Sequence, residues 1–347
     1  MPYVSARLGA RSLVAAAAIA CCALLPGQAL ASVTLSNWDS AQQRQVVKAG
    51  LMSNLGHSFQ GGSALSASQA NAAMSALSLR LARQTGQSQA RAASATHSPV
   101  SVVTLDKMLV AQLGLSDVAS HVQSTAASAG LAPPSYFGTE VVARFLGLRY
   151  NHPTGTDELE LFPGDPITRA EAAWSLAQIA GFGDWNVSYA RDTLMGFELP
   201  SMSSGQRRAL TIAVSRIGYP YVWGGTTDDT SDGLAHGGFD CSGFVWRVFK
   251  LSGLPWGNRI GGRTAAQMAQ EIPHGQRLHI NRLKPGDLLF FGTAHFNSTA
   301  TEQNVIHTGI YLGDNWVIHS SGQGVYVEPL RGSWLGDSFV WGRRVIG

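Results

Sequence analysis

The chain has 347 residues, of which 45% are apolar and only 14% are charged, and its formal net charge is +3. A chain of this length can form two domains of ordinary size, each with its own apolar core. The small net charge, without a stripe of Lys and Arg along the sequence, argues against a nucleic-acid-binding protein.

The first 31 residues have the three parts of a secretory signal peptide. Arg7 and Arg11 supply the positive start, residues 13–25 form a short apolar run, and residues 29–31 (Ala-Leu-Ala) form a small-x-small cleavage site. The apolar run is short for a membrane span. We therefore expect a mature chain without a membrane span, secreted or associated with the cell wall. A retained anchor helix and a lipid anchor on Cys21 are the alternatives.

Residues 32–200 are rich in Ala, Leu and Ser, and their apolar residues recur at helical spacing. The pattern predicts helices over 66–83, 104–113, 135–148 and from Thr168 to the glycines at 181 and 183. We expect Thr104 to cap the second helix, and Thr168 and Glu171 to form a capping box on the fourth. Segments rich in Pro, Gly and Ser between these helices predict loops.

A motif at the helix starts of this region is repeated. Its clearest copy is Phe-Pro-Gly-Asp-Pro-Ile-Thr-Arg-Ala-Glu-Ala at 162–172, and 65–70 and 103–107 are degenerate copies. The motif resembles the S-layer homology repeat, in which a Phe-x-Pro turn precedes a helix that starts with Thr-Arg-Ala-Glu. The resemblance implies an all-α region that binds secondary cell-wall polymers, with Arg169 contributing. Helix capping explains Arg169 and Glu171 equally well.

The sequence changes character after a Pro/Ser/Gly segment at 200–205, which divides a region 32–200 from a second domain, 201–347. A helix is predicted over 206–217. Short alternating segments then predict strands at 287–291, 305–312, 316–319, 325–328 and 339–345. Helices first and antiparallel strands after them predict an α+β domain.

Cys241 is the only cysteine outside the predicted leader. A lone cysteine in an oxidising compartment has no internal disulfide partner, so it is either an inert buried residue or a nucleophile. A helical apolar pattern begins directly after Asp240-Cys241-Ser242-Gly243. It puts Cys241 in a first helical turn, where unpaired N–H groups and the helix dipole favour an anion. We therefore expect a reactive thiol with a pKa below the value of about 8.5 for free cysteine.

Two histidines lie on adjacent predicted strands, joined by the hairpin turn Gly-Asp-Asn at 313–315. A hairpin can place His307 and His319 side by side on one face of a sheet. We expect His307 to take the thiol proton and to return it to the leaving amine, and His319 to orient the ring of His307. His236 and His295 lie in loops without the spacing of a metal site, so we expect neither a metal nor a cofactor.

Five segments of the second domain occur in a characteristic order: 218–225 (Gly-Tyr-Pro-Tyr-Val-Trp-Gly-Gly), 239–245 (Phe-Asp-Cys-Ser-Gly-Phe-Val), 283–291 (Leu-Lys-Pro-Gly-Asp-Leu-Leu-Phe-Phe), 307–313 (His-Thr-Gly-Ile-Tyr-Leu-Gly) and 317–320 (Val-Ile-His-Ser). Together they resemble the NlpC-type family of papain-like cell-wall cysteine peptidases, over about residues 206–347. The resemblance implies a papain-like fold with the triad Cys241, His307 and His319.

The resemblance also assigns residues around the nucleophile. It implies that the Tyr221 hydroxyl joins the Cys241 backbone N–H in stabilising the oxyanion, and that Asp240 and Ser242 contact the amino terminus of the substrate. Two loops, 226–238 and 292–304, are longer than is usual in the family, and the first is acidic. Both flank the predicted groove, where they would reshape substrate entry.

The substrate likewise comes from the resemblance. It implies hydrolysis of peptidoglycan stem peptides at the bond between D-γ-glutamate and a diamino acid. An amidase or a peptidase for another stem-peptide bond is the alternative on the same fold. A catalytically silent wall-binding protein is the alternative outside enzymes.

Overall fold

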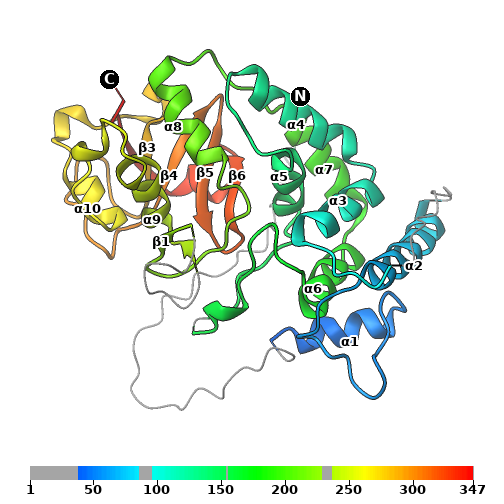
Figure 1. Cartoon of the computed structure of the whole chain (residues 1–347). Coiled ribbons are helices and arrows are strands. Elements are labelled where there is room, and N and C mark those ends of the chain that lie inside the picture. The colour runs from blue at the N-terminus through cyan, green and yellow to red at the C-terminus, as the bar shows by residue number, and fades with distance from the viewer. Residues whose placement is uncertain (1–37, 86–95, 154, 229–236, 347) are drawn as a thin grey trace, which may run out of the picture. The chain divides into compact units, whose positions relative to one another are not determined.

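The computed structural model describes residues 38–85, 96–153, 155–228 and 237–346 (Figure 1). These residues belong to one compact unit. A single cluster of buried apolar side chains extends from Val46 to Ile346, so the helices before residue 200 and the sheet after it share one core. The predicted leader, 1–31, lies outside the described residues. No helix of the described part is long and apolar enough to cross a membrane.

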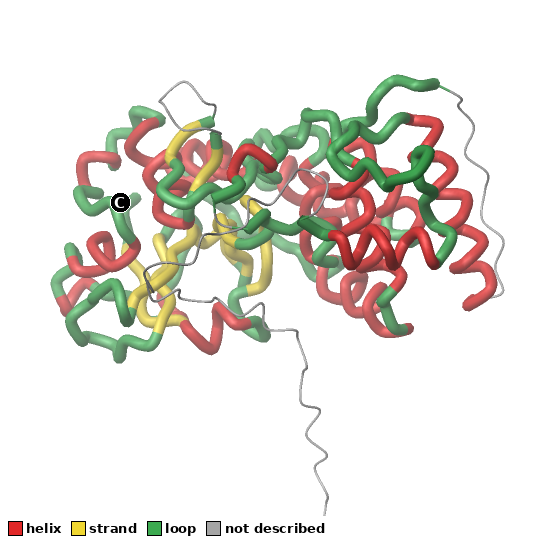
Figure 2. The backbone as a smooth tube through the Cα atoms, turned by 90° about the horizontal axis from the view of Figure 1, so that it is seen from below, coloured by secondary structure: helices red, strands yellow, loops and turns green. Residues whose placement is uncertain are grey.

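Helices make up the first part of the described chain, and Figure 2 shows them gathered beside the sheet. They are α1 (Ser40–Lys48), α2 (Ala67–Thr85), α3 (Val102–Gln112), α4 (Ser116–Ser128), α5 (Phe137–Phe145), α6 (Arg169–Ala180), α7 (Asp184–Leu194) and α8 (Ser204–Val214). The predictions of α2, α3, α5, α6 and α8 are confirmed. Among these eight, α1, α4 and α7 were not predicted. For α7, Gly183 had been taken only as a stop, but it is the N-cap of the next helix.

Three segments that precede helices bond to one another in a ring. The Leu65 N–H donates to the Ile167 carbonyl (2.8 Å), the Ile167 N–H to the Val100 carbonyl (2.9 Å), and the Val100 N–H to the Leu65 carbonyl (3.0 Å). All three side chains are buried. The ring therefore satisfies backbone groups that would otherwise be unpaired in the core.

Each segment of the ring ends in a hydroxyl side chain that caps the following helix. Ser66 accepts from the Gln69 N–H, Ser101 from the Thr104 N–H, and Thr168 from the Glu171 N–H. The three equivalent segments agree with a threefold repeat, with one correction. The N-cap of α3 is Ser101 and not Thr104, so the copy at 103–107 had been placed three residues too late.

The sheet in the second half has five antiparallel strands in the order β6-β5-β4-β3-β7. Their bounds are β3 (Leu288–Gly292), β4 (Val305–Gly313), β5 (Trp316–Ser321), β6 (Gly324–Pro329) and β7 (Phe339–Arg343). They confirm the five predicted strands to within two residues at each end. A small pair, β1 (Thr226–Thr227) and β2 (Gly238–Phe239), lies apart from this sheet.

Apolar side chains at alternate positions of the strands point to opposite faces of the sheet, and the two faces belong to different apolar clusters. Phe290, Ile310 and Ile318 join the large core, whereas Phe291 and Val317 pack with Leu335 of α11 (Trp334–Ser338) in a smaller one. The helix α9 (Cys241–Trp246) packs against β4 and β5, and α10 (Ala265–Gln270) packs against β3 and β4. A π-helical turn at Arg247–Leu251 continues α9.

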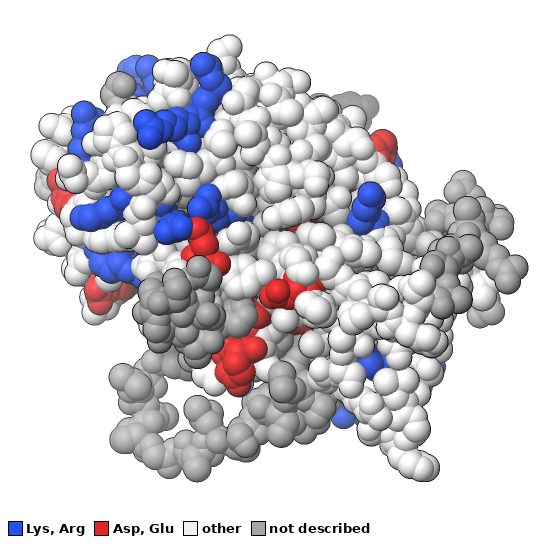
Figure 3. Space-filling view, viewed as in Figure 1, with Lys and Arg blue, Asp and Glu red and all other residues white. Residues whose placement is uncertain are grey.

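Most of the face shown in Figure 3 is formed by residues other than Lys, Arg, Asp and Glu. Lys and Arg side chains gather in separate groups over the upper left of the view, and Asp and Glu side chains gather near the middle. The basic groups on this face do not form a continuous stripe, as expected from the small net charge.

Candidate active site

Cys241 is the first residue of α9, and Asp240 caps that helix by accepting the Gly243 N–H. The loop before the helix approaches it very closely, because a Cβ on Gly243 would lie 1.8 Å from the Gly225 carbonyl oxygen. Only glycine fits there. The Thr308 backbone on β4 makes a hydrogen bond with the thiol. The start of α9 therefore holds the sulfur against the strand that carries His307.

Asp240 and Ser242 bond to each other and to Arg263. The Ser242 hydroxyl donates to Asp240 (2.9 Å), and the Arg263 guanidinium donates to Asp240 (3.1 Å) and to the Ser242 oxygen (2.8 Å). Asp240 also accepts the Gly224 N–H (3.1 Å). These bonds organise the loop around Cys241, and contact of Asp240 and Ser242 with a substrate stays a prediction. Arg263 was not predicted as a site residue, because no local pattern links it to Cys241.

His307 and His319 lie side by side, with 2.8 Å between Nε2 of His307 and Nδ1 of His319. Both side chains are buried. The pairing of Ile310 with Ile318 continues along the hairpin, so that Gly309 faces His319, and a Cβ on Gly309 would lie 3.0 Å from the His319 Cβ. Glycine at this position leaves room for the two rings.

A carboxylate that the sequence analysis missed lies behind His319. Nε2 of His319 is 2.9 Å from Oε1 of Glu328 on β6. The Tyr326 hydroxyl and the Trp334 indole N–H both donate to the same oxygen, each at 3.0 Å. Alternation along β6 could have indicated Glu328, since it lies two residues after Tyr326, which pairs with His319.

The titration of the thiol differs from the expectation. Burial, and after it the Asp240 carboxylate, raise the pKa of Cys241 to about 12. Hydrogen bonds with the Thr308 and Ser242 backbones and the charge of Arg263 lower it, but by less. The predicted pKa below 8.5 is therefore wrong for the free protein, because the desolvation of a thiolate outweighs the favourable helix terminus.

Burial also holds the pKa of His307 well below its usual range, and the neighbouring His319 contributes. A thiol with a raised pKa and an imidazole with a lowered one are both neutral near pH 7. The resting arrangement of Cys241 and His307 is therefore a neutral pair.

Tyr221 lies near Cys241 and Asp240. Burial raises the pKa of its hydroxyl, and the charges of Cys241 and Asp240 raise it further. The hydroxyl is thus protonated at neutral pH and able to donate a hydrogen bond. The oxyanion role of Tyr221 stays a prediction.

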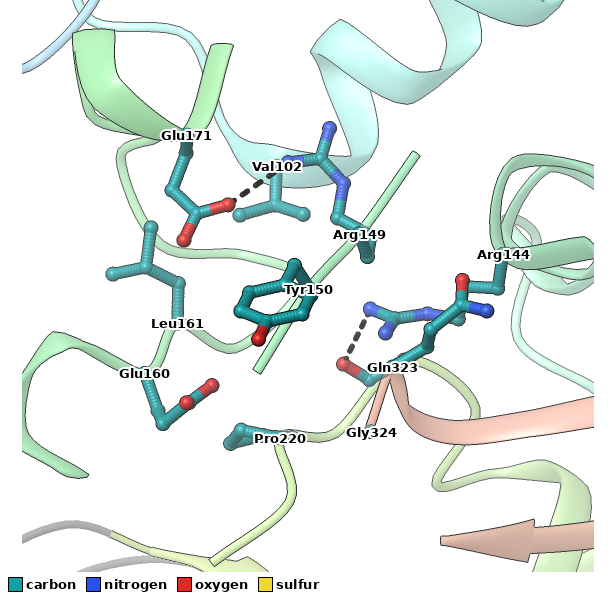
Figure 4. Close-up of a pocket in the computed structure, with 11 residues that line it drawn as sticks. Val102, Arg144, Arg149, Tyr150, Glu160, Leu161, Glu171, Pro220, Gln323 and Gly324 are labelled. Carbon is teal, nitrogen blue, oxygen red and sulfur yellow. Dashed lines mark hydrogen bonds and ion pairs between the residues drawn. The ribbon is translucent and has the colours of Figure 1, made fainter. Parts of the chain in front are cut away.

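A pocket separate from the histidine pair lies where the helical region meets segments 218–220 and 323–324 of the second half (Figure 4). Arg144 of α5 donates to the Gly218 carbonyl (2.8 Å). Nη1 of Arg149 is 3.6 Å from Glu171. The charged side chains that line this pocket thus pair with one another or with the backbone across the junction.

His152 bridges two of the carboxylates beside the pocket. It is 3.1 Å from Glu160 and 2.9 Å from Glu171. Burial lowers the pKa of His152, but the hydrogen bonds to the two glutamates outweigh it and raise the pKa to about 10. Because the Glu171 side chain is used here, the predicted capping box with Thr168 is only half formed, through the Glu171 N–H.

Arg169 is buried, with 1% of its side chain exposed. It donates to the Phe59 carbonyl (2.9 Å) and to the Ser53 carbonyl, and its guanidinium lies 4.6 Å from the centre of the Phe59 ring. These contacts tie residues 53–59 to the start of α6. They give Arg169 a structural role, and its role in polymer binding stays a prediction.

The acidic loop is described only in part. Asp228 forms ion pairs with Arg216 and Arg247, whereas His236 lies outside the described residues. Within the described ranges, no group of three or more His, Cys, Asp or Glu side chains could hold a metal ion.

Comparison with known proteins identifies the second half of the chain. The sequence model of the NlpC/P60 family matches residues 218–344. YafL, a probable endopeptidase of Escherichia coli, is 35% identical over 136 residues, which are 38% of this chain and 46% of YafL. The gamma-D-glutamyl-L-lysine dipeptidyl-peptidase of Bacillus subtilis is 31% identical over 114 residues, which are 33% of this chain and 31% of that protein.

Among solved structures, the NlpC/p60 domain of the peptidoglycan hydrolase SagA is 30% identical, with a TM-score of 0.30, and the match covers 40% of this chain and 97% of that one. The chain spans less than half the length of the curated relatives it matches. Residues 218–344 are thus an NlpC/P60 domain, with its antiparallel sheet toward the C-terminus and helices before it.

Proposed function

We propose that this protein, with its NlpC/P60 domain at 218–344, is an exported peptidoglycan hydrolase that cleaves stem peptides as a cysteine endopeptidase. The observation that carries the proposal is the hydrogen bond between His307 and His319. His307 lies on β4, the strand against which α9 holds Cys241. The hydrogen bond leaves Nδ1 of His307 as the ring nitrogen that can take the thiol proton.

The proposed reaction uses these residues as follows. His307 removes the Cys241 proton as the sulfur attacks the scissile carbonyl carbon, and the tetrahedral oxyanion accepts hydrogen bonds from the Cys241 N–H and the Tyr221 hydroxyl. The His307 imidazolium then protonates the leaving amine, which leaves a thioester. A water molecule, deprotonated by His307, hydrolyses the thioester and frees Cys241.

The proposed bond is that between D-γ-glutamate and the diamino acid of the stem peptide. The similarity to the B. subtilis gamma-D-glutamyl-L-lysine dipeptidyl-peptidase supports it. Mass analysis of the fragments released from purified peptidoglycan tests it, because each bond gives a different pair of new termini. Release of fragments cut at the glycan–peptide amide would indicate the amidase instead.

A substitution at the nucleophile tests the enzyme class. Cys241→Ala should abolish fragment release without changing the unfolding midpoint, because the thiol is the group that attacks. Gln270→Ala, at the exposed end of α10, is the control and should keep the parental rate. Digestion by Cys241→Ala at the parental rate would remove Cys241 from the mechanism. A parental chain without activity would favour the catalytically silent wall-binding protein.

We further propose that the helical region 32–200 binds a secondary cell-wall polymer. The ring of three equivalent segments, each followed by a capped helix, supports a threefold repeat of the S-layer homology kind. The full-length Cys241→Ala variant should sediment with sacculi and lose this binding when the secondary polymer is extracted from them. Equal sedimentation with extracted sacculi would leave peptidoglycan itself as the ligand.

A further inference from the structure

We infer that Glu328 is a positioning residue that fixes the direction of the hydrogen bonds from His319 to His307, and so keeps the proton-accepting nitrogen of His307 free for Cys241. The inference rests on the proposed roles of Cys241 and His307 and extends them by a fourth residue. It follows from the three contacts of a single carboxylate oxygen.

The direction of these bonds starts at Glu328. Its Oε1 receives the Tyr326 hydroxyl and the Trp334 indole N–H, and indole nitrogen is a donor only. An ionised carboxylate only accepts. The bond of 2.9 Å between this oxygen and Nε2 of His319 therefore requires that the histidine donates.

The proton on Nε2 of His319 determines which nitrogen donates in the hydrogen bond between His319 and His307. A neutral imidazole has one N–H and one acceptor nitrogen, so Nδ1 of His319 accepts. Across the 2.8 Å contact, Nε2 of His307 must then carry the proton and donate it. Nδ1 of His307 is left with its lone pair, as a general base requires.

Without Glu328 the opposite direction becomes available. The Tyr326 hydroxyl and Nε2 of His319 both bond to Oε1 of Glu328, so without that oxygen the hydroxyl would be free to donate to Nε2 of His319. The proton of His319 would move to Nδ1 and be donated to His307, whose own proton would then lie on Nδ1. That form of His307 cannot accept the thiol proton. If one hydrogen bond favours the wrong tautomer, the fraction of His307 able to accept the thiol proton falls by about fivefold to tenfold.

The face of the sheet explains why Glu328 can reach this position. His319 pairs with Tyr326, and Val317 pairs with Glu328, so these four side chains lie on the same face of β5 and β6. The side chain of Glu328 is 13% exposed and that of His319 is fully buried. Trp334 of α11 lies over the two histidine rings, with its centre 5.2 Å from His307 and 6.1 Å from His319.

The test compares Glu328→Met with a second-site rescue. Glu328→Met should slow both the release of stem-peptide fragments and the alkylation of Cys241 by iodoacetamide at pH 7, each by about tenfold. Adding His319→Asp should recover most of the loss, because a carboxylate at position 319 can only accept from His307 and needs no partner to fix its direction. Glu198→Met, which removes an exposed carboxylate outside both loops that flank the groove, is the matched control and should change neither rate.

Two results would overturn the inference. Parental alkylation and hydrolysis in Glu328→Met would show that Glu328 does not set the direction. A loss that His319→Asp does not relieve, with a lowered unfolding midpoint, would make Glu328 a structural residue. Alkylation requires no peptide substrate, so a chain that releases no fragments but shows the alkylation pattern would refute the proposed function and leave the role of Glu328 standing.

Discussion

The buried ion pair between Arg149 and Asp106 gives the sharpest prediction for stability. Nε of Arg149 lies 3.0 Å from both carboxylate oxygens of Asp106, and the two side chains are 5% and 0% exposed. Arg149→Met keeps a side chain of similar length but removes the charge. Asp106 is then left in the core beside Glu140, whose pKa burial raises to about 8.

The magnitude follows from the burial of this pair. Two unit charges about 4 Å apart attract by about 4 kcal/mol at an effective dielectric constant of about 20. Removing one partner of a buried pair costs about 3–5 kcal/mol, because the other charge stays without compensation. Domains of this size are stable by about 5–15 kcal/mol. Arg149→Met should therefore lose a large part of the free energy of unfolding.

Urea unfolding at pH 7, followed by circular dichroism, measures this loss. Arg191→Met is the control, because its pair with Asp117 is exposed (38% and 61%) and should contribute no more than about 1 kcal/mol. The double variant Arg149→Met/Asp106→Leu should recover most of the stability, since an apolar pair of similar volume replaces the ions. A loss in Arg149→Met no larger than in Arg191→Met would refute the reasoning.

Two further predictions concern catalysis. Because the pKa of His307 is lowered and that of Cys241 is raised to about 12, the neutral pair is present from well below neutral pH to far above it. A plot of kcat/KM against pH should thus be flat from about pH 6 to about pH 9, and a narrow bell centred at neutrality would show instead an ionised pair in the free protein. His307→Ala should lower kcat/KM by about 10²–10⁴, and His319→Ala by less, because the base moves the proton and its neighbour only orients it. Equal and mild losses in both variants would show that neither is the base.

Local sequence patterns were enough to predict the five strands of the sheet and the helices α2, α3, α5, α6, α8 and α9. The alternation of apolar residues depends only on which face of the sheet is buried, so the five strands could be predicted to within two residues. Helices α1, α4, α7, α10 and α11 were not predicted, because they are short, because their apolar stripe is weak, or because a glycine looked like an end. The N-cap of α3 was misplaced, because two hydroxyl residues, Ser101 and Thr104, compete for that role in the sequence and only the ring of backbone bonds selects the first.

The candidate site was predictable where its residues lie on one helix start and one hairpin. The sequence by itself determined Cys241 as the first residue of a helix and His307 and His319 as neighbours, because both statements need only local geometry. Arg263 and Glu328 entered only with the tertiary structure, since their contacts join elements that are distant in the chain or on a neighbouring strand. The structure also reversed the expected pKa shift of the thiol. A helix terminus is visible in the sequence, but the desolvation of a buried charge depends on everything that packs around it.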